Sequence, residues 1–193
     1  MISAERVAFL LCDMQVKFRP AIKYFQEITE VSQKLVETSK ILNIPLIVTE
    51  QYPEGLGSTI PELDITHAVG IFPKTKFSML IPEVENVLAN KCCSEGVEAV
   101  ILFGIEAHVC IEQTALDLRA KNIQVHVVAD ATSSRSQEDR LLAFERLRQY
   151  GCFVSTSESV IFKLLKDKNH PDFSAIRPLI KNVSPQTGLS SKI

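Results

Sequence analysis

The sequence predicts an α/β protein of three layers (α/β/α), in which a doubly wound parallel sheet of six strands lies between two layers of helices. Short apolar runs alternate with segments whose apolar residues recur every three or four positions, as in successive βα units. The runs 7–12 and 99–103 are continuously apolar, which is typical of strands buried on both faces. A length of 193 residues, with 46% hydrophobic and 23% charged residues, suits one globular domain.

Each expected strand is a short apolar run bounded by turn-forming or polar residues. In chain order the strands are 7–12, 46–49, 68–72, 99–103, 124–128 and 153–156. Pro73 is expected to stop the third strand and Gly104 to end the fourth. The segment from Glu50 to Asp64 contains two prolines and two glycines, and we expect it to form a long loop.

Five helices are expected between and after these strands, because each segment gathers its apolar residues on one side. They are 28–42, 82–91, 109–120, 136–150 and 157–165. Pro82 suits a first helical position, Ser136 suits an N-cap, and Gly151 ends the helix before it. We expect residues 1–184 to form one domain and the polar residues 185–193 to form a flexible tail.

Charge and hydropathy exclude several classes of partner. Lysine and arginine number 21 against 23 acidic residues, and a net charge of −2 gives no basic excess for binding nucleic acid. No apolar run approaches the ~20 residues that cross a membrane, and no signal peptide is recognisable. We therefore expect a cytoplasmic protein. The alternative is a peroxisome-like organelle, because Ser191-Lys192-Ile193 differs at one position from a Ser-Lys-Leu address.

Three chemically active side chains follow different strands of the expected sheet. Asp13 follows the first strand, Lys74 the third and Cys110 the fourth. Because ligands bind beyond the carboxyl ends of strands in open α/β sheets, we expect an acid, a base and a thiol to meet at one edge. The simpler alternatives are that Asp13 caps a turn and that Lys74 is solvated at the surface.

Cys110 stands out among the five cysteines because it lies where a strand turns into a helix. Helix N-termini carry partial positive charge and free N–H groups, which favour a thiolate and can hold an oxyanion. The alternative is a buried cysteine that packs the start of the helix, which we expect of most of the other thiols. His108, two residues earlier, is expected to point away from the thiol.

These residues resemble the motifs of the isochorismatase-like family of cysteine hydrolases, and in particular its isochorismatase domain-containing branch. Four stretches match in the family's order over residues 7–160, and together they are specific although each is weak alone. They are Asp13-Met-Gln15, Thr49-Glu-Gln-Tyr-Pro53 with Gly55-Leu-Gly57, Lys74-Thr-Lys-Phe-Ser78 and Gly104-Ile-Glu-Ala-His-Val-Cys110.

The resemblance implies the isochorismatase-like hydrolase fold and a catalytic triad of Asp13, Lys74 and Cys110. It also implies a cis peptide bond between Ile105 and Glu106, with the N–H groups of Glu106 and Cys110 facing an oxyanion.

Metal and cofactor are not expected. Nicotinamidases of this fold hold a metal with an Asp/His cluster after the second strand. The corresponding stretch here, Glu50-Gln-Tyr-Pro53, has no histidine.

From the resemblance we expect a cysteine-dependent hydrolase that cleaves a small amide, ureide or related C–N substrate through a thioester. The candidate substrate-binding residues lie beside the triad in the sequence: Gln15, Phe18, Gln51, Tyr52 and Phe77. Phe18 and Phe77 could equally belong to the core. The alternatives are a non-catalytic scaffolding protein and a thiol redox enzyme that pairs Cys110 with Cys12 or Cys152. We expect a homo-oligomer, whether a dimer, a tetramer or a larger assembly.

Overall fold

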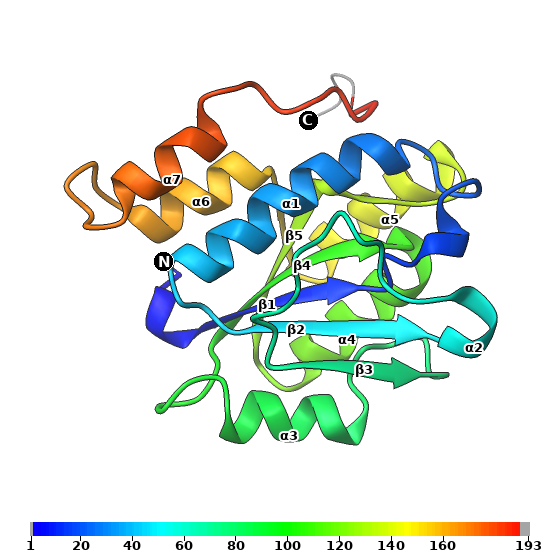
Figure 1. Ribbon diagram of the computed structural model, residues 1–193. Helices are drawn as coiled ribbons and strands as arrows, with labels where there is room; N and C mark the ends of the chain where they lie inside the picture. Colours follow the sequence, from blue (N-terminus) through cyan, green and yellow to red (C-terminus); the bar gives the residue numbers. More distant parts are fainter. Residues whose placement is uncertain (1, 190–193) are drawn as a thin grey trace.

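The computed structural model describes residues 2–189 and contains one six-stranded sheet in which all neighbouring strands are parallel. The strand order is β3-β2-β1-β4-β5-β6, so the direction of winding reverses between β1 and β4 (Figure 1). The strands are β1 (Val7–Cys12), β2 (Leu46–Gln51), β3 (Gly70–Lys74), β4 (Ala99–Ile105), β5 (Gln124–Ser133) and β6 (Phe153–Ser155). The predicted doubly wound α/β class is confirmed.

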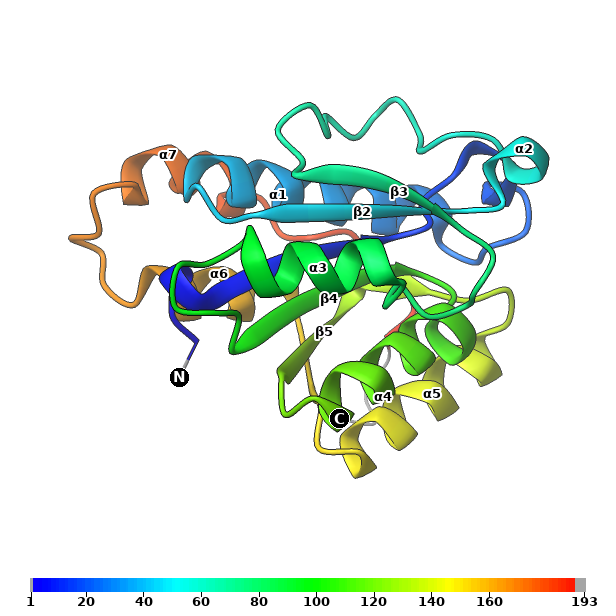
Figure 2. The ribbon, with the colours of Figure 1, turned by 90° about the horizontal axis from the view of Figure 1, so that it is seen from below.

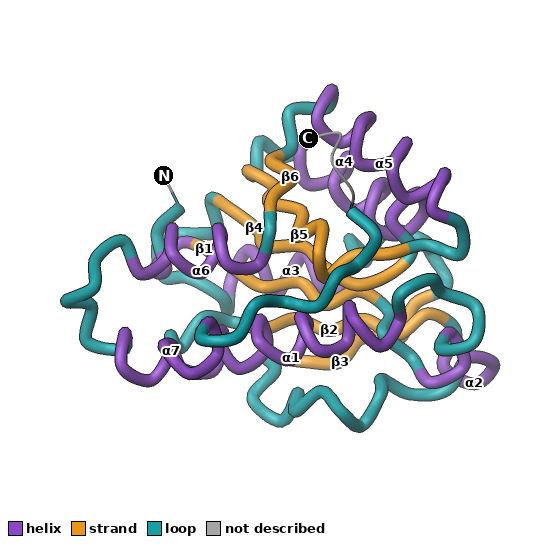
Figure 3. Tube along the Cα trace, turned by 90° about the horizontal axis from the view of Figure 1, so that it is seen from above, coloured by secondary structure: helices purple, strands orange, loops and turns teal. Residues whose placement is uncertain are grey.

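Helices cover both faces of the sheet (Figures 2 and 3). One layer consists of α1 (Phe25–Ile41), α6 (Ser157–Leu165) and α7 (Phe173–Ile180). The other consists of α3 (Pro82–Asn90), α4 (Glu112–Ala120) and α5 (Gln137–Gln149). Short helical turns complete the elements: η1 (Ala4–Arg6), η2 (Val16–Phe18), α2 (Pro53–Leu56) and the π-helical turn η3 (Ala107–Ile111).

Alternate residues of β1 divide the core into two parts. Phe9 and Leu11 pack with the apolar faces of α1 and α6. Leu10 and Cys12 pack on the opposite face, with residues of α3, α4 and α5. Every residue of β1 is fully buried, which explains why the run is apolar without alternation.

Four strands extend past their expected ends, and these extensions build the edge where the side chains of interest lie. β2, expected to end at 49, continues to Gln51. β3 continues through Pro73 to Lys74, because β3 is at the edge of the sheet and a missing N–H is tolerated there. β4 continues through Gly104 to Ile105, and β5 continues to Ser133 rather than ending at 128. Gly104 has a φ of +121°, and a Cβ there would overlap the carbonyl oxygen of Cys12.

The C-terminal part of the described chain is more ordered than its composition suggested. Helix α7 was not expected, since Pro178 lies inside it. Beyond it, Arg140 donates a hydrogen bond to the Thr187 carbonyl and Gln137 donates one to the Gly188 carbonyl. The segment 185–189, expected to be loose, is thus held against the domain as far as Leu189. The tripeptide Ser191-Lys192-Ile193 lies outside the described residues.

Between residues 2 and 189, no helix combines the length and apolar character needed to cross a membrane.

Candidate functional site

The three candidate side chains lie together at the carboxyl edge of the sheet. Asp13 follows β1, Lys74 is the last residue of β3, and Cys110 lies in the η3 turn that follows β4. The sheet order brings β1 and β4 side by side at the point where the winding reverses, which is where α/β proteins usually bind ligands.

Asp13 and Lys74 form a buried ion pair. The Lys74 Nζ lies 2.7 Å from Oδ2 of Asp13, and the side chains of the two residues are 0% and 1% exposed. The hydroxyl of Thr49, from the end of β2, donates a 2.8 Å hydrogen bond to Oδ1 of Asp13. Asp13 itself has a φ of +53°, a left-handed conformation that Asp tolerates better than most residues. Each carboxylate oxygen therefore has a fixed partner.

The ammonium group of Lys74 is surrounded by oxygen atoms. Besides Asp13, it donates to Oε1 of Gln51 at 2.6 Å, to the carbonyl of Phe77 at 2.9 Å and to the carbonyl of Lys76 at 3.2 Å. Burial alone would lower the pKa of Lys74, but electrostatic interactions with the Cys12, Asp13 and Cys110 side chains outweigh burial and raise it. The surroundings of Lys74 therefore favour its charged ammonium form.

Cys110 brings its sulfur to the same place. It is 7% exposed, and its carbonyl accepts a 2.6 Å hydrogen bond from the Thr114 hydroxyl one helical turn later. That hydroxyl in turn accepts a 2.8 Å bond from the N–H of Met79, which fixes η3 to the segment before α3. The Cys110 Sγ, an Asp13 carboxylate oxygen and the Cys12 Sγ all lie within 4.8 Å of one another.

Thr49 is a site residue that the sequence analysis did not identify, and Cys12 was named there only as a possible redox partner of Cys110. Cys12 ends β1, Thr49 lies near the end of β2, and the two residues face each other in the β1–β2 register. The Cys12 thiol donates to Oδ2 of Asp13 at 3.5 Å, while burial and the charges of Asp13 and Cys110 raise the pKa of Cys12 well above its usual value. The only sequence signal was their position at strand ends, next to Asp13 and Glu50 respectively.

The turn between β4 and η3 has the backbone feature that the family resemblance implied, since the Ile105–Glu106 peptide bond is cis. Ile105 is fully buried, and the carboxylate of Glu106 lies 3.3 Å from Arg135. Ser134 holds the turn: its hydroxyl accepts a 3.0 Å bond from the N–H of Ala107. The same hydroxyl lies 3.0 Å from Nδ1 of His108, so the His108 ring is directed to Ser134.

Two glutamines near the triad have different surroundings. Gln15 is fully buried, and its amide group donates to the carbonyls of Gln51 and Gly57 and accepts from the Gln51 N–H. Gln15 therefore joins the ends of β1 and β2 and has no free N–H for a substrate. Gln51 instead contacts Lys74 through Oε1 and the Thr75 carbonyl through Nε2, so it positions the ammonium group.

The three aromatic candidates also differ. Phe18 packs against the core cluster on the α1 face, so its position suits the core alternative. Tyr52 and Phe77 are 54% and 52% exposed and lie just after β2 and β3. Tyr52 and Phe77 therefore remain available to contact a ligand at this edge of the sheet.

The carboxylate of Glu50, which lies in β2, is already engaged in hydrogen bonds. Oε1 of Glu50 accepts hydrogen bonds from both the N–H and the hydroxyl of Thr59, at 2.6 and 2.8 Å. Within residues 2–189 there is one close-set group of potential metal ligands, and it consists of Cys12, Asp13 and Cys110.

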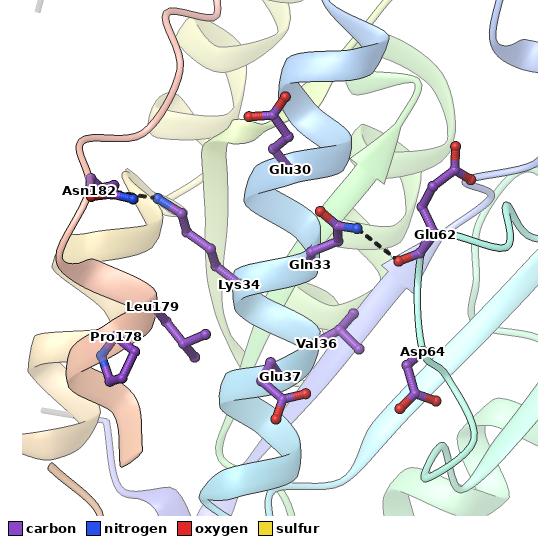
Figure 4. A pocket seen from close by; sticks show the side chains of 10 residues that line it. All are labelled: Glu30, Gln33, Lys34, Val36, Glu37, Glu62, Asp64, Pro178, Leu179 and Asn182. Atoms are coloured by element: carbon purple, nitrogen blue, oxygen red, sulfur yellow. Dashed lines mark hydrogen bonds between the residues drawn. The ribbon is translucent and has the colours of Figure 1, made fainter. Parts of the chain in front are cut away.

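A groove of about 460 Å³ lies elsewhere, between α1, the loop around Glu62 and α7 (Figure 4). Its acidic side chains come from two elements, and those of Glu62 and Asp64 already pair with Arg19 and Lys40. The groove lining includes none of the triad residues, so we do not assign the chemistry to it.

Comparison with known proteins shows which proteins this chain is similar to. The model of the isochorismatase domain matches residues 7–159. Isochorismatase domain-containing protein 1 from Danio rerio is 54% identical over 192 residues, which are 100% of this chain and 67% of that protein. The same-named protein from Salmo salar is 54% identical over 185 residues, 96% of this chain and 64% of that protein. The chain thus spans about two thirds of the length of these relatives.

A solved structure described as MAR1 ribonuclease from Caenorhabditis elegans is similar over the whole chain. It has a TM-score of 0.92 and 47% sequence identity, with 100% of this chain and 99% of that chain covered.

Proposed function

The chain belongs to the isochorismatase domain family, and from this premise we propose that it hydrolyses a small amide, ureide or related C–N substrate through a thioester on Cys110. One observation carries the proposal. The Asp13 carboxylate lies within 4.8 Å of the Cys110 sulfur and 2.7 Å from the Lys74 ammonium, in a site almost closed to water. An acid, a cation and a thiol in this arrangement are the parts that acyl transfer to sulfur needs.

In the first half of the proposed reaction, Asp13 accepts the proton of the Cys110 thiol while Lys74 balances the negative charge. The thiolate attacks the substrate carbonyl and forms a tetrahedral intermediate. The N–H groups of Glu106 and Cys110 stabilise its oxyanion, and Asp13 returns the proton to the leaving nitrogen. In the second half, Asp13 takes a proton from water while the water oxygen attacks the thioester carbonyl. The C–S bond breaks, the acid is released, and the proton returns from Asp13 to the Cys110 sulfur.

The proposed substrate site lies between Tyr52 and Phe77, above the triad. Both rings are more than half exposed, and their loops follow the strands that supply Gln51 and Lys74. Two exposed aromatic rings near the triad suit a compact, partly planar substrate such as an amide or ureide. The remaining expected contacts, Gln15 and Phe18, are assigned to the scaffold because of their burial and bonding.

RNA is the substrate class suggested by the name of the Caenorhabditis elegans structure. We favour a small molecule, because the net charge of −2 gives no basic excess for phosphate contacts. A scaffolding role would not require a buried Asp13–Lys74 pair beside a thiol, since such pairs rarely add stability.

The test is ammonia release from a panel of amides and ureides, together with a parallel assay for cleavage of single-stranded RNA. We expect turnover of at least one small substrate and a covalent acyl adduct on Cys110 by mass spectrometry. Cys110→Ala should abolish both and leave the melting temperature nearly unchanged, whereas Cys152→Ala should retain activity. Full activity of Cys110→Ala on any substrate found would refute the mechanism, and RNA cleavage alone would overturn the substrate class.

A further inference from the structure

The proposed mechanism leaves one buried thiol of the site without a role. Cys12 is fully buried, and its Sγ lies within 4.8 Å of the Cys110 Sγ. Cys110 is the more accessible of the two, at 7% exposure. The site thus contains a dithiol pair in which one residue is slightly exposed and the other is fully buried.

We propose that Cys12 is the resolving thiol of an oxidative modification site, in which a hydroperoxide oxidises Cys110 and Cys12 then closes a disulfide with it. This reaction uses the same reactive thiol as the proposed hydrolase but requires no turnover of a C–N substrate. Reversible disulfide formation would switch off the nucleophile and protect it from further oxidation.

The chemistry balances in two steps. The Cys110 thiolate attacks one peroxide oxygen, the O–O bond breaks, and the other oxygen leaves and takes a proton to become water (or an alcohol). Cys110 is then a sulfenic acid, oxidised by two electrons. Next the Cys12 sulfur attacks the Cys110 sulfur, so that an S–S bond forms and the S–OH bond breaks. The departing hydroxide takes the Cys12 proton and leaves as a second water.

The topology selects Cys12 over the other cysteines. Cys93 lies 3.9 Å from the carbonyl of Val7, at the start of β1, and the length of β1 separates that point from Cys12 by roughly 16 Å. Cys92 precedes Cys93, and Cys152 lies just before β6, also at the amino edge of the sheet. Only Cys12 ends a strand at the edge where Cys110 lies.

The surroundings keep Cys12 inert until Cys110 is oxidised. Burial, a hydrogen bond with Cys110 and the charges of Asp13 and Cys110 raise the pKa of Cys12, so it is a protonated thiol at rest. Oxidation of Cys110 to a sulfenic acid makes its sulfur electrophilic. The Asp13 oxygen, 3.5 Å from the Cys12 sulfur, can then accept the Cys12 proton as the disulfide forms and pass it to the departing hydroxide.

The experiment treats the full chain with a small excess of hydrogen peroxide in the presence of a chelator. Free thiols are then alkylated in denaturant, and the peptides are mapped by mass spectrometry. We expect the wild type to lose two of its five free thiols and to yield a Cys12–Cys110 cross-linked peptide. Dithiothreitol should restore both thiols.

Cys12→Ser, with Cys12→Ala as a second variant, should lose the cross-link and accumulate Cys110 as sulfinic acid, which dithiothreitol does not reduce. The matched control, Cys152→Ser, should form the disulfide like the wild type, and thermal melts should verify that each variant is folded. Irreversible Cys110 oxidation to the same extent in the wild type and in both folded Cys12 variants would overturn the proposal, as would cross-linking of Cys110 to another cysteine. Because the readout is sulfur chemistry, it is independent of whether the hydrolase proposal holds.

Discussion

The ammonium of Lys74 and the carboxylate of Asp13 lie 2.7 Å apart with their side chains almost fully buried, although 61 residues separate them in the chain. The pair exists because β3 and β1 both end at the same edge of the sheet, on either side of β2. Its properties lead to the first of four predictions.

Lys74→Met should destabilise the fold by about 3–5 kcal/mol, because it leaves the Asp13 carboxylate buried without a counter-charge. It should also remove hydrolase activity, since Lys74 balances the thiolate charge in the proposed mechanism. Urea unfolding measures the stability change. Lys76→Met is the control: Lys76 pairs with Asp117 at the surface, so its loss should cost no more than about 1 kcal/mol. Equal effects of the two substitutions would contradict the assignment.

Gly104→Ala should destabilise the protein by at least about 3 kcal/mol, because the position has a φ of +121° and the added Cβ would overlap the Cys12 carbonyl. The displaced Cys12 precedes Asp13, so activity should fall in any protein that folds. Gly96→Ala is the matched control, since its φ of +83° is also positive but no atom lies within 4 Å of an added Cβ. Thermal melts of the two variants should differ clearly; similar melting temperatures would show that the close contact is unimportant.

Stability should decrease as the pH falls from about 6.5 to about 4, in part because of His126. Burial and the nearby Lys163 lower the pKa of His126 from 6.5 to about 4, so in this window the unfolded chain binds a proton that the folded chain does not. The contribution is present above pH 6.5 and is lost through about pH 4, with a size of up to about 3 kcal/mol. His126→Phe keeps the stack on Phe153 and should flatten the pH profile of unfolding. An unchanged slope in His126→Phe would refute this account.

The domain should self-associate through the α4–α5 layer. Exposed apolar side chains are more numerous on these two helices than on α6, where Phe162 is the exposed one. Leu116 lies on α4, Leu141 and Leu142 lie on α5, and the exposed Tyr150 is the C-cap of α5. Leu142→Glu should therefore shift the protein to a smaller species in size-exclusion chromatography with light scattering. Phe162→Glu, on the other layer, should not. A monomeric wild type would exclude the interface.

Most of the architecture could be predicted from the sequence, because strands buried on both faces are continuously apolar and the helices have one apolar face. The positions at which the strands end could not be predicted. Proline and glycine usually interrupt strands. Here Pro73 lies on an edge strand, and Gly104 lies so close to the Cys12 backbone that no side chain would fit. Helix α7 was missed because Pro178 lies inside it, although Ile176 on this helix is fully buried.

The candidate site, too, could be predicted from the sequence only in part. Asp13, Lys74 and Cys110 could be proposed from their places after strands, since parallel strands end at a common edge. The contacts of Thr49 and Cys12 depend on the register between neighbouring strands, which the sequence does not reveal. The hydrogen bonds between the Gln15 amide and backbone groups could not be predicted either, because an amide next to a candidate acid does not show whether backbone groups already satisfy it.

Arg140 makes the polar end of the described chain part of the interior. Its guanidinium is fully buried and donates to the carbonyls of Ala129, Thr132 and Thr187, and no carboxylate among residues 2–189 forms an ion pair with it. Burial lowers the pKa of Arg140 to about 10. Shortening the chain at residue 184 would take away the Thr187 acceptor and leave an N–H of a buried cation unsatisfied. Expression boundaries and fusion joints for this protein therefore belong after Leu189, even though the composition of the preceding residues suggests that they are dispensable.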